Sequence, residues 1–144
     1  MVTKSVSVPE FRYRDFVNDL TETVCRFEPN GNFTYVNEVF CRMFGKEPKD
    51  LIGKRWHPVA HPDDVSYIEA KLGEMSAENP VVVIENRVYD ANDELRWMQF
   101  INRGIYSTDG KLIDIQSVGR DITSLKKAQE RLDLALSGSG FLGA

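Results

Sequence analysis

Three consecutive segments that alternate apolar and polar residues constrain this fold more than any other feature of the sequence. They run from Val81 to Asp90, from Glu94 to Ser107 and from Lys111 to Arg120, separated by the turn-forming residues Ala91-Asn92-Asp93 and Thr108-Asp109-Gly110. A period of two is typical of a β-strand with one buried face. Because connections this short join antiparallel neighbours, the pattern predicts an antiparallel meander.

A second pair of strand-like segments precedes the meander. Thr23 to Glu28 and Asn32 to Val36 flank Pro29-Asn30-Gly31. Asn-Gly favours a tight turn because both residues tolerate positive φ. We therefore predict a hairpin here.

Short helical segments lie between the hairpin and the meander. Asn37 to Gly45 predicts a helix, with Asn37 as the N-cap and Gly45 as a left-handed end residue. Glu47 to Ile52 predicts a further helical turn. His61-Pro62-Asp63-Asp64 predicts the start of a helix reaching about Met75, because Pro suits the first helical position and carboxylates suit the N-terminal end of the helix dipole.

Helices are also predicted at both ends of the chain. Glu10 to Leu20 carries apolar residues at helical spacing, after a loose tail. Thr123 to Ser137 predicts a C-terminal helix that Ser137-Gly138-Ser139-Gly140 should break. Its apolar residues step like coiled-coil a and d positions: Leu125, Ala128, Leu132 and Ala135. Helices and strands in this order predict an α+β fold.

Composition and charge exclude several classes of partner. The 144 residues carry a formal net charge of −4, and their basic residues are scattered, so we expect no nucleic-acid partner. The apolar run Val81 to Ile84 is too short to cross a bilayer, and the N-terminus lacks the apolar run of a signal peptide. We expect a cytoplasmic segment without membrane contact, whose parent protein could be anchored elsewhere.

The cysteines and histidines do not form a metal-binding pattern. Cys25 and Cys41 show no C-x-x-C spacing and should be reduced, semi-buried thiols. His57 and His61 lie four residues apart, but Pro58 and Pro62 interrupt any common helix. We predict no metal site and expect His61 to cap the helix that follows it.

No residue pattern in the chain indicates catalysis. The sequence lacks a nucleophile elbow and shows no paired acid and base of an active site. Gly138 to Gly143 satisfies G-x-G-x-x-G, but a helix precedes it, whereas a dinucleotide site needs a strand before it and a helix after it. We read it as a flexible break between domains and expect no enzymatic activity in this chain.

Several short motifs, in order, resemble the PAS sensor family with its C-terminal PAC portion. They are Phe33-Thr34-Tyr35-Val36-Asn37, Phe40, Phe44-Gly45, Leu51-Ile52-Gly53-Lys54, His61-Pro62-Asp63-Asp64, Trp97, Asp109-Gly110 and Gly119-Arg120-Asp121-Ile122-Thr123. The resemblance implies a PAS fold: a five-stranded antiparallel sheet with short helices on one face, an N-terminal helix and a C-terminal output helix. It divides the chain into a tail with flanking helix (1–20), a PAS/PAC domain (21–123) and an output helix or connector (124–144). Asp93 stands where many relatives have Gly.

The resemblance also implies a role in signalling. Such modules belong to multidomain proteins such as sensor histidine kinases, in two-component systems, and diguanylate cyclases. Some relatives hold haem through a histidine, and a flavin-binding branch uses a reactive cysteine. Cys41-Arg42-Met43-Phe44 resembles that branch only superficially, because it lies on an earlier helix. We expect neither haem nor flavin, and any cofactor stays unknown.

The resemblance further selects the inner face of the meander as the wall of a ligand cavity. The wall comprises Val82, Ile84, Asn86, Val88, Met98, Phe100, Asn102, Ile113, Ile115 and Ser117. Asn86, Asn102 and Ser117 would be polar groups on an apolar wall, so they either pair with each other, backbone or water, or orient a ligand. If a ligand is present, a small, partly polar metabolite fits best.

The outer face and the last helix predict how a signal would leave the domain. Trp97, Ile101, Ile105 and Val118 form an apolar outer face that the N-terminal helix or a second subunit could cover. We expect a homodimer through the N-terminal helix, this face and the C-terminal helix. The output residues would be Asp121, Thr123, Leu125 and Leu132, since Asp121 or Thr123 can cap the helix and the family's Asp-Ile-Thr couples it to the sheet. Two functions stay open: a ligand-binding sensor, and a ligand-free dimerisation and relay module that contacts adjacent domains.

Overall fold

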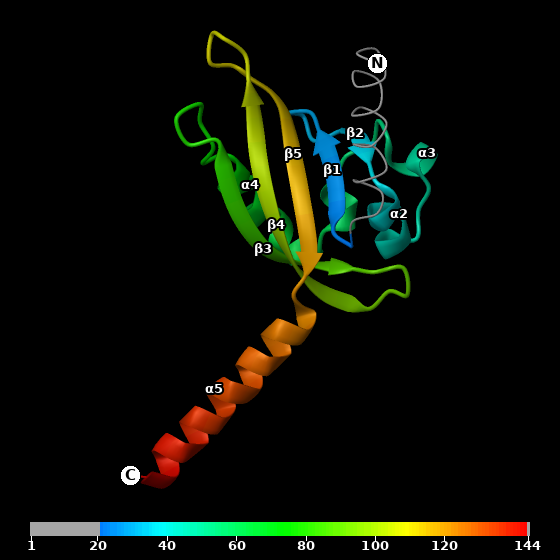
Figure 1. Cartoon of the computed structure of the whole chain (residues 1–144). Coiled ribbons are helices and arrows are strands. Elements are labelled where there is room, and N and C mark those ends of the chain that lie inside the picture. The colour runs from blue at the N-terminus through cyan, green and yellow to red at the C-terminus, as the bar shows by residue number, and fades with distance from the viewer. Residues whose placement is uncertain (1–20, 144) are drawn as a thin grey trace, which may run out of the picture.

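One five-stranded antiparallel sheet organises the chain. The computed structural model describes residues 21–143, and the side chains of residues 21–138. The strands are β1 (Thr23–Phe27), β2 (Phe33–Val36), β3 (Val81–Tyr89), β4 (Leu95–Tyr106) and β5 (Leu112–Asp121). Their order is β2-β1-β5-β4-β3, and helices lie on one face of the sheet (Figure 1). The predicted meander, hairpin and α+β class are confirmed, whereas the predicted helix at Glu10 to Leu20 lies outside the described residues.

Short helices connect β2 to β3. They are α2 (Glu38–Phe44), α3 (Pro48–Leu51), the 3-10 turns η1 (His57–Val59) and η2 (Pro62–Asp64), and α4 (Val65–Leu72). As predicted, Asn37 is the N-cap of α2 and Gly45 ends it with φ 64°. The Asn37 carboxamide oxygen accepts from Phe40 N at 2.9 Å and from Val24 N at 3.0 Å, so one side chain joins α2 to β1. Helix α4 ends at Leu72, and Gly73 follows it as the C-cap residue. The helix is therefore three residues shorter than predicted, since we expected it to reach Met75.

A β-bulge corrects one predicted wall residue. Ile105 pairs with Asp114 and Tyr106 with Leu112, so Ile113 has no partner on β4. The extra residue shifts the alternation of faces by one position. Ile113 is therefore 51% exposed, and the half-buried Leu112 packs against the core instead.

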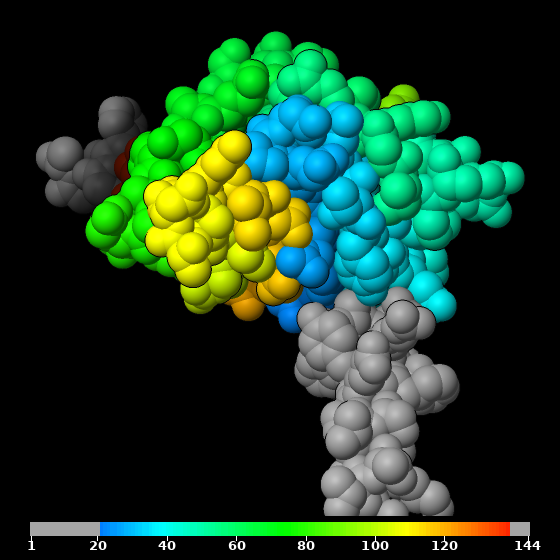
Figure 2. Space-filling view, turned by 90° about the horizontal axis from the view of Figure 1, so that it is seen from above, coloured from blue at the N-terminus to red at the C-terminus, as the bar shows by residue number. Residues whose placement is uncertain are grey.

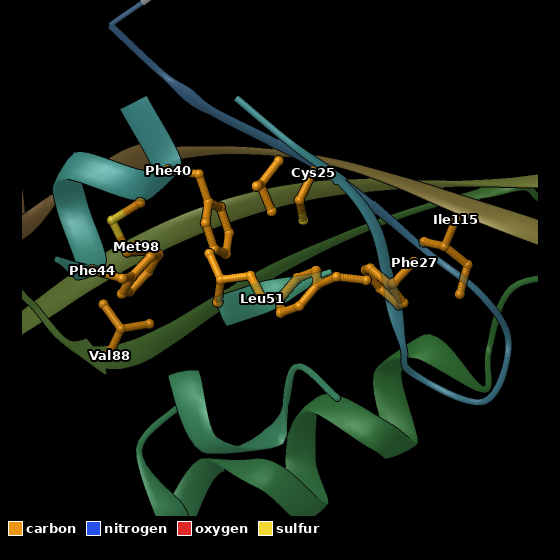
Figure 3. Close-up of a cluster of buried hydrophobic side chains, with 10 residues drawn as sticks. Cys25, Phe27, Phe40, Phe44, Leu51, Val88, Met98 and Ile115 are labelled. Atoms are coloured by element: carbon orange, nitrogen blue, oxygen red, sulfur yellow. The ribbon is translucent and has the colours of Figure 1, made fainter. Parts of the chain in front are cut away.

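The core lies between the inner face of the sheet and the short helices. Aromatic residues from β1, β2 and α2 form its centre, together with aliphatic residues of β3, β4 and β5 (Figure 3). Phe33 packs edge-on against Phe40, with ring centroids 5.3 Å apart. A second cluster joins Ala60 and Ile68 to Val82 and Ile84 of β3. The helices thus stand on the sheet face that the sequence predicts to be buried.

The last helix is longer than predicted. Helix α5 (Thr123–Gly143) starts one residue after the end of β5 and extends away from the sheet (Figure 1). It continues through Ser137-Gly138-Ser139-Gly140, so the predicted break is wrong. Each glycine makes a helix less stable by about 1 kcal/mol without forbidding helical φ and ψ, so it does not by itself end the helix.

Two turns lie side by side at the far end of the sheet from α5. Seen from above, the yellow atoms of the β4–β5 turn lie beside the blue atoms of the β1–β2 turn (Figure 2). In the β1–β2 turn only Gly31 has a positive φ, 94°, so the expectation of a turn suited to positive φ at both Asn30 and Gly31 is met at one of them. The carboxamide of Asn30 instead accepts from Asn32 N at 2.9 Å.

Asp93, the departure from the family pattern, is the one non-glycine residue of the described chain with positive φ, 59°. This conformation costs a residue with a Cβ about 1–2 kcal/mol, and less for Asp and Asn. We therefore expect Asp93→Gly to raise the free energy of unfolding by about 0.5 kcal/mol, measured by urea denaturation.

Gly110 provides the matched control. It has φ 83°, and a Cβ there would meet no atom within 4 Å. Gly110→Ala should therefore lower stability by about 1 kcal/mol through backbone strain alone. A stability loss in Asp93→Gly would show that the Asp93 side chain holds its turn together.

Candidate functional site

A cavity lies between the sheet and the short helices. Its volume is about 60 Å³. Side chains from the sheet and from the segments between β2 and β3 line it: Cys25, Phe27, Phe33, Phe40, Trp56, Val59, Ala60, Ile68, Leu72, Ile84, Asn86, Val88, Phe100, Asn102 and Ser117. The lining is almost wholly apolar, with carboxamide and hydroxyl groups on the sheet side.

The structure places most of the predicted wall around this cavity. Ile84, Asn86, Val88, Phe100, Asn102 and Ser117 line it. Val82, Met98 and Ile115 are buried in the core clusters but do not line the cavity. Gly119 is the cross-strand partner of Phe100, and a Cβ there would lie 2.5 Å from the Phe100 ring. Only glycine therefore lets this ring lie over β5.

The opposite wall was not predicted. Phe40, Trp56, Ala60 and Ile68 come from segments whose packing against the sheet depends on loops without a sequence period. Cys25 and Phe27 could have been predicted as cavity residues from the sequence, because they alternate along the predicted strand. In the structure this strand, β1, pairs with β5 at Cys25↔Ser117 and Phe27↔Ile115.

A row of polar side chains crosses the inner face of the sheet. Asn102 of β4 pairs with Ser117 of β5, which pairs with Cys25 of β1. All three are at least nine-tenths buried. Burial raises the pKa of the Cys25 thiol to about 12, although a hydrogen bond with Ser117 partly offsets it. The thiol is therefore protonated at neutral pH and is a poor nucleophile.

The two carboxamides use their nitrogens on backbone carbonyls. Asn102 Nδ2 donates to Val82 O at 3.4 Å and to Phe100 O at 3.3 Å. Asn86 Nδ2 donates to Arg87 O at 3.2 Å. Part of their hydrogen bonding is therefore to backbone, which was one of the two interpretations that the sequence left open.

Hydrogen bonds connect the junction between β5 and α5 to β4. The Thr123 hydroxyl accepts from Trp97 N at 2.9 Å, and Ile122 N donates to Trp97 O at 2.8 Å. The Asp121 carboxylate accepts from Thr123 N at 2.8 Å. The Asp121 carboxylate thus accepts a hydrogen bond from the first backbone N–H of α5. The Thr123 hydroxyl bonds to the sheet instead and does not cap the helix.

Charged side chains surround Trp97 on the outer face. Lys126 Nζ lies 4.8 Å from the centre of the Trp97 ring and 2.7 Å from Glu85 Oε1. This hydrogen bond lowers the pKa of Glu85. The Arg87 guanidinium lies 5.8 Å from the same ring and pairs with Asp64, whose pKa it lowers through its hydrogen bond. Residues of η2, β3, β4 and α5 therefore meet around one indole.

Apolar side chains remain exposed on the outer face and on α5. Val83, Ile101 and Val118 form a cross-strand row, in which Val83 and Ile101 are exposed and Val118 is half-buried. The predicted output residues Leu125 and Leu132 are 61% and 53% exposed. The described part of the chain leaves this row and this helix face uncovered.

The histidines have separate surroundings. His57 stacks on Trp56, with ring centroids 4.0 Å apart, and its Nε2 lies 3.6 Å from Glu69. His61 Nδ1 accepts from Asp63 N at 3.1 Å, which confirms the predicted capping role. Over residues 21–143, no three His, Cys, Asp or Glu side chains lie together as metal ligands would. The helices described there include none with the length and apolar character to cross a membrane.

Comparison with known proteins places this architecture in one family. The family described as PAS fold matches residues 33–119. The chain is 29% identical over 132 residues to the two-component sensor PprA of Pseudomonas aeruginosa, which covers 92% of this chain and 14% of that protein. It is 27% identical over 88 residues to the basic helix-loop-helix ARNT-like protein 2 of Gallus gallus, covering 57% of this chain and 14% of that protein. The chain thus spans about one seventh of these curated relatives.

Solved structures show the same fold. A PAS domain from Colwellia psychrerythraea matches with a TM-score of 0.71 and 17% identity, covering 81% of this chain and 98% of that one. A sensory box histidine kinase/response regulator from Burkholderia thailandensis matches with a TM-score of 0.70 and 20% identity, covering 88% and 96%. At these identities the likeness concerns the fold alone.

The buried Cys25 thiol predicts a loss of stability at alkaline pH. In the unfolded chain a thiol ionises near pH 8.5, whereas in the folded chain the Cys25 pKa is about 12. Above pH 8.5 the folded state therefore retains a proton that the unfolded state has lost. This group should lower the free energy of unfolding by about 1.4 kcal/mol per pH unit up to pH 12.

Urea denaturation of the wild type and of Cys25→Ser between pH 9 and 10.5 measures this effect as a difference in slope. Between pH 6 and 7 the two stability curves should run parallel, because the thiol is protonated in both states. Equal slopes at alkaline pH would contradict the deep burial of a neutral thiol.

Proposed function

This chain belongs to the PAS family, and from that premise we propose that it senses a small molecule in its cavity and passes the signal to α5. In this proposal residues 21–123 sense and residues 124–144 transmit, in the cytoplasmic part of a multidomain signalling protein. The likeness to a two-component sensor supports a sensor histidine kinase as the parent. The proposal gives this chain no catalytic step.

The observation that carries the proposal is that β4 both lines the cavity and contacts α5. Phe100 and Asn102 of β4 line the cavity on one face. Three residues before Phe100 in the same strand, Trp97 holds Thr123 through its backbone and Lys126 through its ring. A small displacement of β4 by an occupant therefore reaches the first turn of α5 directly.

Helix α5 has the shape of a transmitter. Beyond its first turn it extends away from the sheet (Figure 1). Leu125 and Leu132 are both exposed, and their spacing of seven residues puts them on one helix face. An exposed stripe of this kind is stable when a second helix covers it. We propose a homodimer in which α5 and the outer row of Val83, Ile101 and Val118 meet a second copy, and in which α5 leads to an adjacent domain.

A second function is favoured by the size of the cavity. At about 60 Å³ it is much smaller than the roughly 300–1,000 Å³ of sites that enclose drug-sized ligands. A ligand-free dimerisation and relay module would need no larger space. In that case the stimulus would arise in another domain and pass through the same contacts at Trp97.

Native mass spectrometry of residues 1–144, purified without added ligand, distinguishes the two functions. We expect a mass above that of the denatured chain, because a ligand held between the sheet and the short helices must leave through the packed core and dissociates slowly. The excess mass gives the ligand's mass, and the charge-state series reports monomer or dimer. A dimer without excess mass would contradict the sensor and support the relay module.

The Thr123 hydroxyl offers a test of the connection between β4 and α5. Thr123→Val keeps the shape but removes the acceptor for Trp97 N, which would leave a part-buried donor unpaired. We expect a loss of about 1–3 kcal/mol in the free energy of unfolding and faster amide exchange in the first turn of α5. Hydrogen exchange with mass spectrometry, beside urea denaturation, measures both.

Thr123→Ser is the matched control, because it retains the hydroxyl and removes only a methyl group. Its exchange in the first turn of α5 should stay close to that of the wild type. Equal acceleration in the two variants would show that the methyl group, and not the hydrogen bond to Trp97, holds α5 to the sheet.

A further inference from the structure

The cavity indicates a chemical class of ligand. We propose that it takes a small, uncharged molecule that donates a hydrogen bond to the Asn102 carboxamide oxygen and lays an apolar remainder against the aromatic residues of the opposite wall. This inference rests on the proposed function, because it concerns the ligand of the same cavity.

The orientation of the Asn102 carboxamide is fixed by its neighbours. Its nitrogen lies near two backbone oxygens, those of Val82 and Phe100, at 3.4 and 3.3 Å. An amide oxygen in that position would face two other acceptors, so the nitrogen must point there. The oxygen is then left without a donor among residues 21–138, on a side chain that is only 4% exposed and lines the cavity.

Asn86 is a second, separate acceptor. Its nitrogen donates to Arg87 O, so its oxygen is also left over. Asn86 lies four residues along β3 from Val82, the partner of Asn102, which is roughly 13 Å at the rise of a strand. One small molecule cannot reach both oxygens. We place the donor at Asn102 because Ser117 and Cys25 continue the polar row there.

The lining excludes charged ligands. None of the cavity-lining side chains in the described part of the chain is an acid or a base whose charge could pair with a ligand, apart from the neutral thiol of Cys25. A carboxylate or ammonium would enter without a counter-charge, at a large desolvation cost. A ketone or an ether would leave the Asn102 oxygen unpaired, and a buried polar site discriminates against such analogues.

The volume limits the size of the ligand. A water-sized group takes up roughly 10–15 Å³ when volume is counted this way. The cavity of about 60 Å³ therefore holds roughly four to six non-hydrogen atoms. Short alcohols and primary amides have this size and chemistry.

Four probes titrated into the ¹⁵N-labelled chain, residues 1–144, test the inference by NMR. Butan-1-ol carries the donor, butan-2-one is its acceptor-only analogue, butanoate is the anion, and xenon reports an apolar cavity of any kind. We expect butan-1-ol to shift the Asn102 side-chain resonances and to bind about three- to tenfold more tightly than butan-2-one, the value of one hydrogen bond. Butanoate should leave the resonances of cavity residues unchanged.

Asn102→Leu should abolish the preference for butan-1-ol over butan-2-one, because it removes the acceptor. Asn86→Leu is the matched control, since it removes the other buried carboxamide and should retain the preference. If Asn102→Leu does not fold, the comparison of probes on the wild type decides alone.

Equal binding of butan-2-one or butanoate would overturn the ligand class while leaving a ligand-binding cavity intact. Xenon binding without binding of butan-1-ol would also overturn it. If xenon fails to bind as well, the cavity admits nothing and the sensing function falls with it. The two proposals therefore fail by different results.

Discussion

The pairing of β4 with both β3 and β5 is the constraint on which the rest of this structure depends. It runs from Arg103 opposite Val81 to Leu95 opposite Tyr89 on one side, and from Met98 opposite Asp121 to Tyr106 opposite Leu112 on the other. Because side chains alternate along a strand, this register puts the cavity wall on one face and the support of α5 on the opposite face. A slip by one residue would exchange the two faces. Cavity and output therefore share one set of backbone hydrogen bonds.

Sequence periodicity predicts this sheet well because strands with one buried face leave a pattern in the residues themselves. Together with the family resemblance, which selects the inner face, it predicts Ile84, Asn86, Val88, Phe100, Asn102 and Ser117 as cavity wall, and it fails at Ile113, where an unpaired residue shifts the alternation. Nothing local in the sequence marks that bulge. The sequence does not predict the opposite wall, for a different reason. Trp56 and Ala60 of that wall lie in loops and turns, whose position is set by packing against the sheet. At α5, two glycines lower helix stability but do not decide where a helix ends.

The sequence leaves open which groups the buried carboxamides bond to, and the structure identifies part of these partners. Alternation puts Asn86 and Asn102 on one kind of sheet face, and the family resemblance selects that face as the inner one. Either bonding to backbone or bonding to a ligand would account for them. The structure pairs both nitrogens with backbone carbonyls, and both side chains line the cavity. In our proposal Asn102 serves both purposes, because its nitrogen bonds to backbone and its oxygen accepts from the ligand. A buried hydrogen-bonding group left without a partner costs about 1–3 kcal/mol, which is a reason for such an oxygen to recruit a ligand or a water.

Energies of this size also limit how the domain can signal. A ligand shifts a conformational equilibrium only by the difference between its affinities for the two states. An occupant of a few atoms that gains or loses one hydrogen bond supplies about 1 kcal/mol, or a shift of roughly fivefold. The contacts that hold α5 to β4, through Thr123, Lys126 and Trp97, are individually of similar size. The two states must therefore lie within a few kcal/mol of each other. A connection through a few weak contacts at one residue, Trp97, satisfies that condition, whereas a helix packed along the whole sheet would not.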